Sequence, residues 1–155
     1  MKLYRFSPIK SVDECNEALE YLDTQLKKLT NEVIGESLPV NSLKIFAHYG
    51  DEHAFLLQWI DSIGKNEESS STSYYVQTQQ PININGDLIS TIGIRTPDPY
   101  RSHVGCGDLS VEDYDNFKDE FLNKSPFIRE IQHPSYEMLE LFHPDFDVLG
   151  YVVKV

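Results

Sequence analysis

The chain has 155 residues, of which 40% are hydrophobic, and this is enough for one folded domain without disulfides or a structural metal. Its 25 acidic and 13 basic residues give a formal net charge of -12, which argues against binding to nucleic acid or to an anionic membrane. The two cysteines lie outside any CxxC pattern, the first ten residues lack an apolar signal region, and no apolar window reaches the ~20 residues of a membrane span. We therefore expect a cytoplasmic protein.

The first predicted element is a long helix over residues 11–34. Apolar residues recur in it at spacings of three and four, and Ser11 with Glu14 forms a capping box at its start. Gly35 is suited to end the helix. We expect residues 1–42 to form a helical extension that precedes the main fold.

Residues 43–98 then predict a first module of strands and one helix. The segments are, in chain order, a strand over 43–50, a helix over 50–64, an exposed polar loop over 65–73, and strands over 74–82 and 88–96. Asn85-Gly86 between the last two strands is a pair typical of a hairpin turn.

Residues 99–155 repeat this order as a second module. The segments are a strand over 103–110, a helix over 111–124 with Ser110 as its N-cap, a short strand over 127–132, and strands over 135–142 and 147–155. A shift of about 61 residues aligns the helices and places Tyr75 on Tyr136. The sequence thus predicts a single α+β domain in which two βαββ(β) modules form a curved mixed sheet after a long N-terminal helix.

The paired modules and the segment MLELFHPDFDVLGYVV resemble the vicinal oxygen chelate superfamily, which includes glyoxalase I, extradiol dioxygenases and bleomycin-resistance proteins. The resemblance covers residues 43–155. It implies a cup between the modules that holds a divalent metal through His, Gln or Glu on the first and last strand of each module. On the first strands, His48 and Asp108 are the candidate metal ligands, whereas Gly150 stands where an acid of the closing strand is expected.

Glu140 is the candidate catalytic residue. Strand alternation places it on one face with Tyr136, Met138 and Phe142, where a carboxylate among aromatic rings can act as a general base. Alternatively, this strand lies near the edge of the sheet and the acid reaches solvent.

The stretch IRTPDPYRSHVGCGD joins the two modules and carries the candidate ligand-binding residues Arg95, Tyr100, Arg101 and His103. Two arginines in an acidic protein can clamp a carboxylate or phosphate, or they can pair with acids such as Asp98 and hold the joint rigid. Asp108 has a similar alternative, because it can help to cap the following helix. Gly105-Cys106-Gly107 indicates a close approach of the backbone or a bulge.

Two functions follow from these features. The first is a small-ligand-binding protein like the vicinal oxygen chelate family, which would work as an isomerase, lyase or dioxygenase with a metal-chelated substrate. The second is a non-catalytic binding or protein-interaction module that has lost the metal site. A small-molecule ligand and a second copy of the chain in a homodimer are the expected partners.

Overall fold

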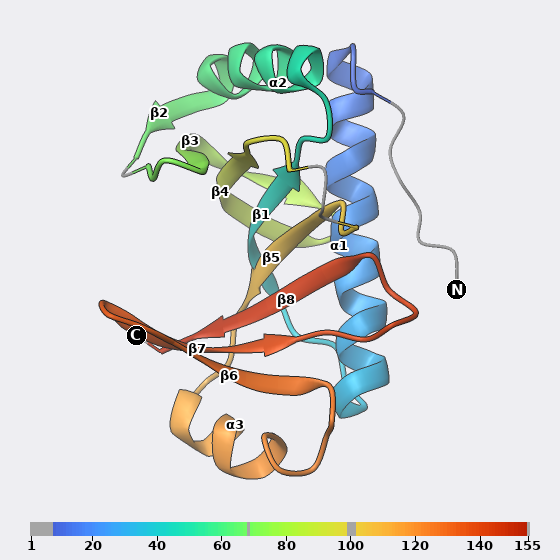
Figure 1. Ribbon diagram of the computed structural model, residues 1–155, viewed down its shortest axis with the longest axis vertical. Helices are drawn as coiled ribbons and strands as arrows, with labels where there is room; N and C mark the ends of the chain where they lie inside the picture. The colour runs from blue at the N-terminus through green and yellow to red at the C-terminus, as the bar shows by residue number, and fades with distance from the viewer. Residues whose placement is uncertain (1–7, 68, 99–101, 155) are drawn as a thin grey trace.

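The described part of the computed structural model, residues 8–67, 69–98 and 102–154, contains one mixed, curved sheet with helices packed against it (Figure 1). The elements are α1 (Val12–Ile34), β1 (Val40–Phe46), α2 (Gly50–Ile63), β2 (Gly64–Asn66), β3 (Ser73–Ile84), β4 (Asp87–Arg95), β5 (Gly105–Leu109), α3 (Tyr114–Phe121), β6 (Ile128–His133), β7 (Tyr136–Leu141) and β8 (Val148–Val153). The strand order is β2-β3-β4-β1-β5-β8-β7-β6.

The sheet consists of two halves with the same topology. In the first half β1 pairs in parallel with β4, and in the second half β5 pairs in parallel with β8. The first strands of the two halves, β1 and β5, pair antiparallel and join the halves at the centre. The predicted α+β class with two modules and a curved mixed sheet is therefore confirmed.

Helix α1 runs along the sheet and covers its centre (Figure 1). Its N-cap is Ser11, whose hydroxyl accepts a hydrogen bond from the backbone N–H of Glu14 at 3.2 Å, and Gly35 ends it in the left-handed region at φ 79°. The leucines of its apolar stripe are fully buried. The predicted N-cap at Ser11 and the predicted stop at Gly35 are confirmed, and the Ser11 hydroxyl also donates a hydrogen bond to a Glu14 carboxylate oxygen at 3.1 Å.

Two glycines of β5 allow α1 to lie close to the sheet. A Cβ atom at Gly105 would lie 2.5 Å from Cδ2 of Leu22, and one at Gly107 would lie 2.6 Å from Cδ1 of Leu26. The expected close approach at Gly105-Cys106-Gly107 is thus present, and the approaching group is the leucine stripe of α1.

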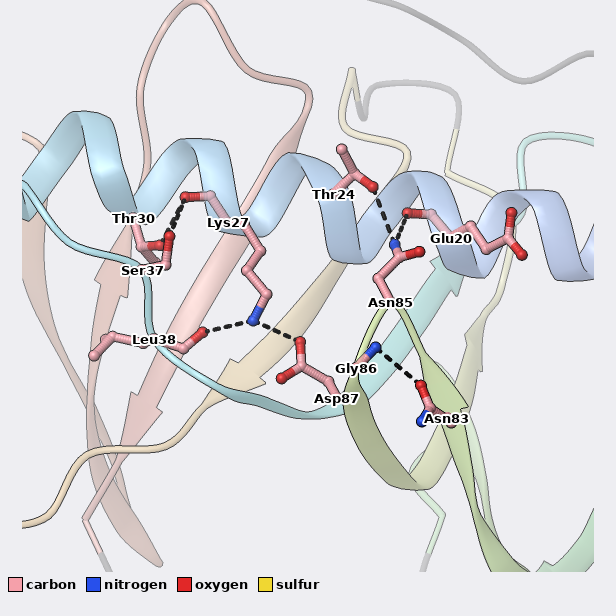
Figure 2. A network of polar contacts seen from close by, with 10 residues as sticks. All are labelled: Glu20, Thr24, Lys27, Thr30, Ser37, Leu38, Asn83, Asn85, Gly86 and Asp87. Atoms are coloured by element: carbon pink, nitrogen blue, oxygen red, sulfur yellow. Dashed lines mark hydrogen bonds and ion pairs between the residues drawn. The ribbon is translucent and has the colours of Figure 1, made fainter.

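The turn between β3 and β4 is held by α1 through polar contacts (Figure 2). Asn85 and Gly86 both have positive φ, at 53° and 93°, as the predicted Asn-Gly hairpin turn requires. Figure 2 shows the Asn85 amide donating to the Glu20 carbonyl and to the Thr24 hydroxyl, at 3.2 and 3.1 Å. Further along the helix, Lys27 Nζ lies 2.7 Å from an Asp87 carboxylate oxygen. The segment expected as an extension is therefore packed and hydrogen-bonded into the fold.

The two faces of the sheet differ in what covers them. The main core lies between the sheet and the helices, and it includes buried residues from all three helices. A smaller apolar cluster of Phe46, Cys106 and Leu149 lies on the opposite face, which we call the open face. Both cysteines are buried and unbonded to each other. Within the described ranges, no helix is long and apolar enough to cross a membrane.

Three local expectations were wrong. Residues 64–66 form β2, which pairs with β3 at the edge of the sheet, although a loop was predicted from residue 65 onward. Helix α3 begins at Tyr114, and Asp113 caps it by accepting a hydrogen bond from the Asn116 backbone at 2.9 Å, so Ser110 is not its N-cap. The first strand begins at Val40, within the range 1–42 that was expected to be a helical extension.

Candidate functional site

A cavity of about 290 Å³ opens on the open face across the centre of the sheet, and we call it the cup. Strand alternation explains which side chains reach it: Leu43 and Ile45 of β1 point to the core, while Ser42, Lys44 and Phe46 point to the cup. The remaining side chains with a polar group that line it are Tyr75 of β3, Arg95 of β4, Cys106 and Asp108 of β5, Tyr136 of β7 and Tyr151 of β8. Both modules therefore contribute to one site.

Lys44 is the central polar group of the cup. Its Nζ donates a hydrogen bond to the Tyr75 hydroxyl at 2.8 Å and a longer one to the Ser73 hydroxyl at 3.4 Å. Within residues 8–67, 69–98 and 102–154, no carboxylate lies within ion-pair distance of this ammonium. Burial lowers the pKa of Lys44, but Cys106 and Tyr75, which become anionic at high pH, outweigh this effect, and the pKa is raised. Lys44 therefore carries its charge at neutral pH.

A glycine makes room for the contact between Lys44 and Tyr75. Gly93 of β4 is the register partner of Lys44 and lies across from Tyr75 on β3. A Cβ atom at Gly93 would lie 2.7 Å from Cδ1 and Cε1 of the Tyr75 ring and 3.4 Å from Cγ of Lys44. The ring thus occupies the space that a side chain would fill, and this places its hydroxyl on the ammonium.

Arg95 brings a second cation to the cup. Its side chain is 20% exposed, its guanidinium lies 5.8 Å from the Phe46 ring centroid, and one nitrogen lies 3.9 Å from an Asp98 oxygen. Among the residues that the structure describes, nothing accepts a hydrogen bond from its Nε. Arg95 therefore forms a long ion pair with Asp98, as one of the sequence-based alternatives expects, and it also lines the cup, as the other alternative requires.

Asp108 is the carboxyl group of the cup. It accepts a hydrogen bond from the Ser42 hydroxyl at 2.8 Å across the pair of central strands. Burial raises the pKa of Asp108, while the bond from Ser42 and the charge of Lys44 offset part of this rise. Asp113, rather than Asp108, caps α3.

The two candidate metal ligands lie apart. Asp108 lines the cup, whereas His48 follows β1 and is absent from the cup lining, and its backbone N–H donates to Glu52 of α2 at 2.8 Å. In the described part of the chain, no three His, Cys, Asp or Glu side chains are grouped so that they could hold a metal ion. Because Lys44 and Arg95 are cationic groups without lone pairs to donate, the donor set of the cup does not fit a divalent metal.

Gly150 is not a lost ligand position. A Cβ atom there would lie 2.8 Å from Leu109 and 3.6 Å from Leu26 of α1, so this position faces the core. The neighbouring Tyr151 faces the cup instead. Because neighbouring residues of a strand point to opposite faces, Tyr151 rather than Gly150 is the residue of β8 that meets the cup.

Glu140 supports the wall of the cup. Its side chain shares the open face with Tyr136 and Met138, as the alternation predicted, but it is buried and only 4% of the residue is exposed. One carboxylate oxygen accepts a hydrogen bond from Nε of Arg129 at 2.6 Å, and the other accepts one from the Tyr151 hydroxyl at 2.8 Å. Both carboxylate oxygens accept hydrogen bonds, and through the second of these Glu140 holds the Tyr151 side chain in place.

The remaining predicted ligand residues are Tyr100, Arg101 and His103. Tyr100 and Arg101 lie outside the described residues. His103 lines a separate cavity of about 310 Å³ next to Phe142 and His143. The structure thus brings Arg95 together with Asp108 but separates both from His103.

Sequence reasoning missed Lys44, Tyr75 and Tyr151. A usable signal existed for Lys44, because a lysine between Leu43 and Ile45 in a central strand must point to the face opposite the core. Tyr75 also had a signal, since the repeat aligned it with Tyr136, and both tyrosines line the cup.

Comparisons with known proteins inform the fold. No protein-family model and no curated protein matches the sequence. A solved structure described as a structural genomics target, Protein EC4020, is similar with a TM-score of 0.67 and 10% identity, over 98% of this chain and 93% of that chain.

Two solved structures of Streptomyces coelicolor methylmalonyl-CoA epimerase in complex with 2-nitronate-propionyl-CoA are also similar, at 13% identity over 76% of this chain and 97% of theirs. The TM-scores are 0.39 and 0.36, so these two carry no argument about the site. The chain is thus similar in fold to Protein EC4020 over nearly its whole length, and its function has to be argued from the cup.

Proposed function

We propose that the cup binds a small anionic ligand. The observation that carries the proposal is Lys44, a charged ammonium that faces the cavity and whose hydrogen-bond partners in the described part of the chain are hydroxyl groups. A hydroxyl leaves the charge uncompensated, and an anion would compensate it through a charge-assisted hydrogen bond.

Arg95 supports the same proposal. It lines the cup with Lys44, so two cations meet in one cavity of a chain whose formal net charge is -12. A guanidinium can bind a carboxylate or phosphate through two parallel hydrogen bonds. The acids near these cations are Asp108 in the cup and Asp98, whose oxygen lies 3.9 Å from Arg95. Two cations in one cavity repel each other, and an anion bound between them would reduce this repulsion.

The proposal requires no metal. The metal-dependent isomerase, lyase or dioxygenase expected from the resemblance needs three or four oxygen, nitrogen or sulfur ligands that face one point, and the cup offers Asp108 and Cys106 beside two cations. In the proposed site, Lys44 and Arg95 hold the anion, while Tyr75 and Ser73 fix the direction of the ammonium.

The test is a titration of the ¹⁵N-labelled protein with sodium acetate and with inorganic phosphate at constant ionic strength. We expect saturable backbone shifts in β1, β4 and β5 for at least one of these anions, and their loss in Lys44→Met. Lys28→Met removes the same charge from an exposed position on α1 and serves as the control. Absence of saturable shifts, or equal weakening by both substitutions, would contradict the proposal.

A further inference from the structure

The lining of the cup is divided between the two modules by chemical character. The cations Lys44 and Arg95 come from the first module, on β1 and β4. Strands β7 and β8 of the second module contribute Tyr136, Met138, Tyr151 and Val153 to the lining. One half of the cup is therefore suited to an anionic group, and the other half presents aromatic and aliphatic surface.

Part of the apolar half consists of side chains that do not cover the core of the protein. Tyr136 is 43% exposed, and Met138 is half-buried next to it on the same face of β7. The main core lies on the other face of the sheet. The Tyr136 ring stacks on His133 of β6, with ring centroids 4.3 Å apart, and it is also part of the cup lining, so an aromatic surface is open to a ligand there.

The charges of the second module exclude the opposite orientation of a ligand, in which its anionic group would lie near Tyr136 and Met138. The acids on that side are Asp108, in the cup, and Glu140, behind Tyr151. The Arg129 side chain is already paired with Glu140 and lies 4.6 Å from the Phe142 ring centroid. In this half, an anionic group would meet carboxyl groups rather than an available cation.

We propose that the ligand is an organic acid with an extended apolar body, whose carboxylate lies at Lys44 and Arg95 and whose body crosses toward Met138 and Tyr136. This inference rests on the proposed binding of an anion in the cup and adds the chemical class and the orientation. The Asp108 carboxyl accepts a hydrogen bond from the Ser42 hydroxyl and lies on β5, between the strands that carry the two halves of the cup. It can therefore contact a polar group of the ligand that lies close to the ligand's carboxylate.

The experiment compares the dissociation constants of acetate, hexanoate and hexanol by isothermal titration calorimetry at constant ionic strength. Each methylene removed from water strengthens binding by about fourfold, so hexanoate should bind at least about tenfold more tightly than acetate. Hexanol, which lacks the charge, should bind at least about tenfold more weakly than hexanoate.

Substitutions separate the two halves. In the double variant Tyr136→Ser/Met138→Ser, the dissociation constant of hexanoate should rise to nearly that of acetate, while the dissociation constant of acetate stays the same. Lys44→Met should instead weaken the binding of both acids. Because Tyr136 is exposed, Tyr136→Ser alone provides a variant whose folding is not in question.

The outcomes distinguish this inference from the proposed function. If acetate and hexanoate bind equally tightly and both depend on Lys44, the apolar body is refuted and the anion site stands. If the substitutions at positions 136 and 138 weaken acetate as much as hexanoate, the orientation is refuted. If neither acid binds but inorganic phosphate still gives saturable shifts that depend on Lys44, this inference is refuted and the anion site stands. If neither acid nor phosphate binds, or hexanol binds as tightly as hexanoate, the anion site itself is refuted and the inference fails with it.

Discussion

Replacing Asp23 by asparagine should stabilise the protein at alkaline pH. Asp23 lies on α1 with no exposed surface, and Asp87 and Lys27 are close to it. Burial, and then the neighbouring Asp87 carboxyl, raise the pKa of Asp23 to about 7. Burial also acts on Asp87, but its interactions with Asp23 and Lys27 outweigh this effect and lower its pKa. At mildly acidic pH the two neighbouring carboxyl groups therefore share one proton.

The sign of the pH dependence follows from this rise. The ordinary pKa of the Asp23 carboxyl is 3.8, and in the folded protein it is about 7. The native state thus binds the proton more tightly, and the stability that this provides is fully present below about pH 4 and is lost as the pH rises to about 7. Three pKa units at ~1.36 kcal/mol each give an upper bound of about 4 kcal/mol.

Asp23→Asn cannot ionise and has nearly the same shape, and its amide can donate to the neighbouring Asp87 carboxylate, which an ionised Asp23 cannot do. We therefore expect the free energy of unfolding of the variant, relative to wild type, to increase by up to about 4 kcal/mol between pH 4 and pH 8. Urea denaturation of both proteins at several pH values measures this difference. Glu17→Gln, an exposed position of the same helix, is the control. If the Asp23→Asn and wild-type stability curves run parallel over this range, the reasoning is refuted.

Three further substitutions test the contacts described above. Gly105→Ala should destabilise the protein by about 1–3 kcal/mol in urea denaturation, because the new Cβ would lie 2.5 Å from the Lys44 carbonyl oxygen, and a wild-type midpoint would disprove the close approach. Tyr151→Phe leaves one buried Glu140 oxygen without its donor and should cost about 1–3 kcal/mol in the same assay, so an unchanged stability would contradict the positioning role of that carboxylate. Ser11→Ala removes the N-cap of α1 and should cost about 1 kcal/mol, seen as a lower melting temperature, whereas an unchanged one would mean that the cap contributes nothing.

The elements with strong local signals were predicted correctly. The α1 helix was visible because its cap, its leucine spacing and Gly35 all agree, and the β3–β4 hairpin was visible because Asn85-Gly86 suits a turn with positive φ. The β2 strand was missed because its residues are polar, and its pairing with β3 is a contact between segments apart in sequence. The location of α1 against the hairpin also depends on such contacts.

The candidate site was predicted in part for the same reason. Arg95 and Asp108 were expected at the joint between the modules, and both line the cup. The Lys44–Tyr75 contact depends on the register of three strands and on the space at Gly93, which the sequence does not reveal. Gly150 was misassigned because a shift of one residue exchanges the faces of a strand. Homodimer formation and cytoplasmic location stay predictions.

The most direct test of the anion site is to locate hexanoate in the cup by intermolecular nuclear Overhauser effects. The account predicts contacts between the methylene next to the carboxylate and the ε-methylene of Lys44, and between the terminal methyl of hexanoate and the methyl of Met138. Contacts confined to other surfaces, or hexanoate bound with its carboxylate at Met138, would contradict the account.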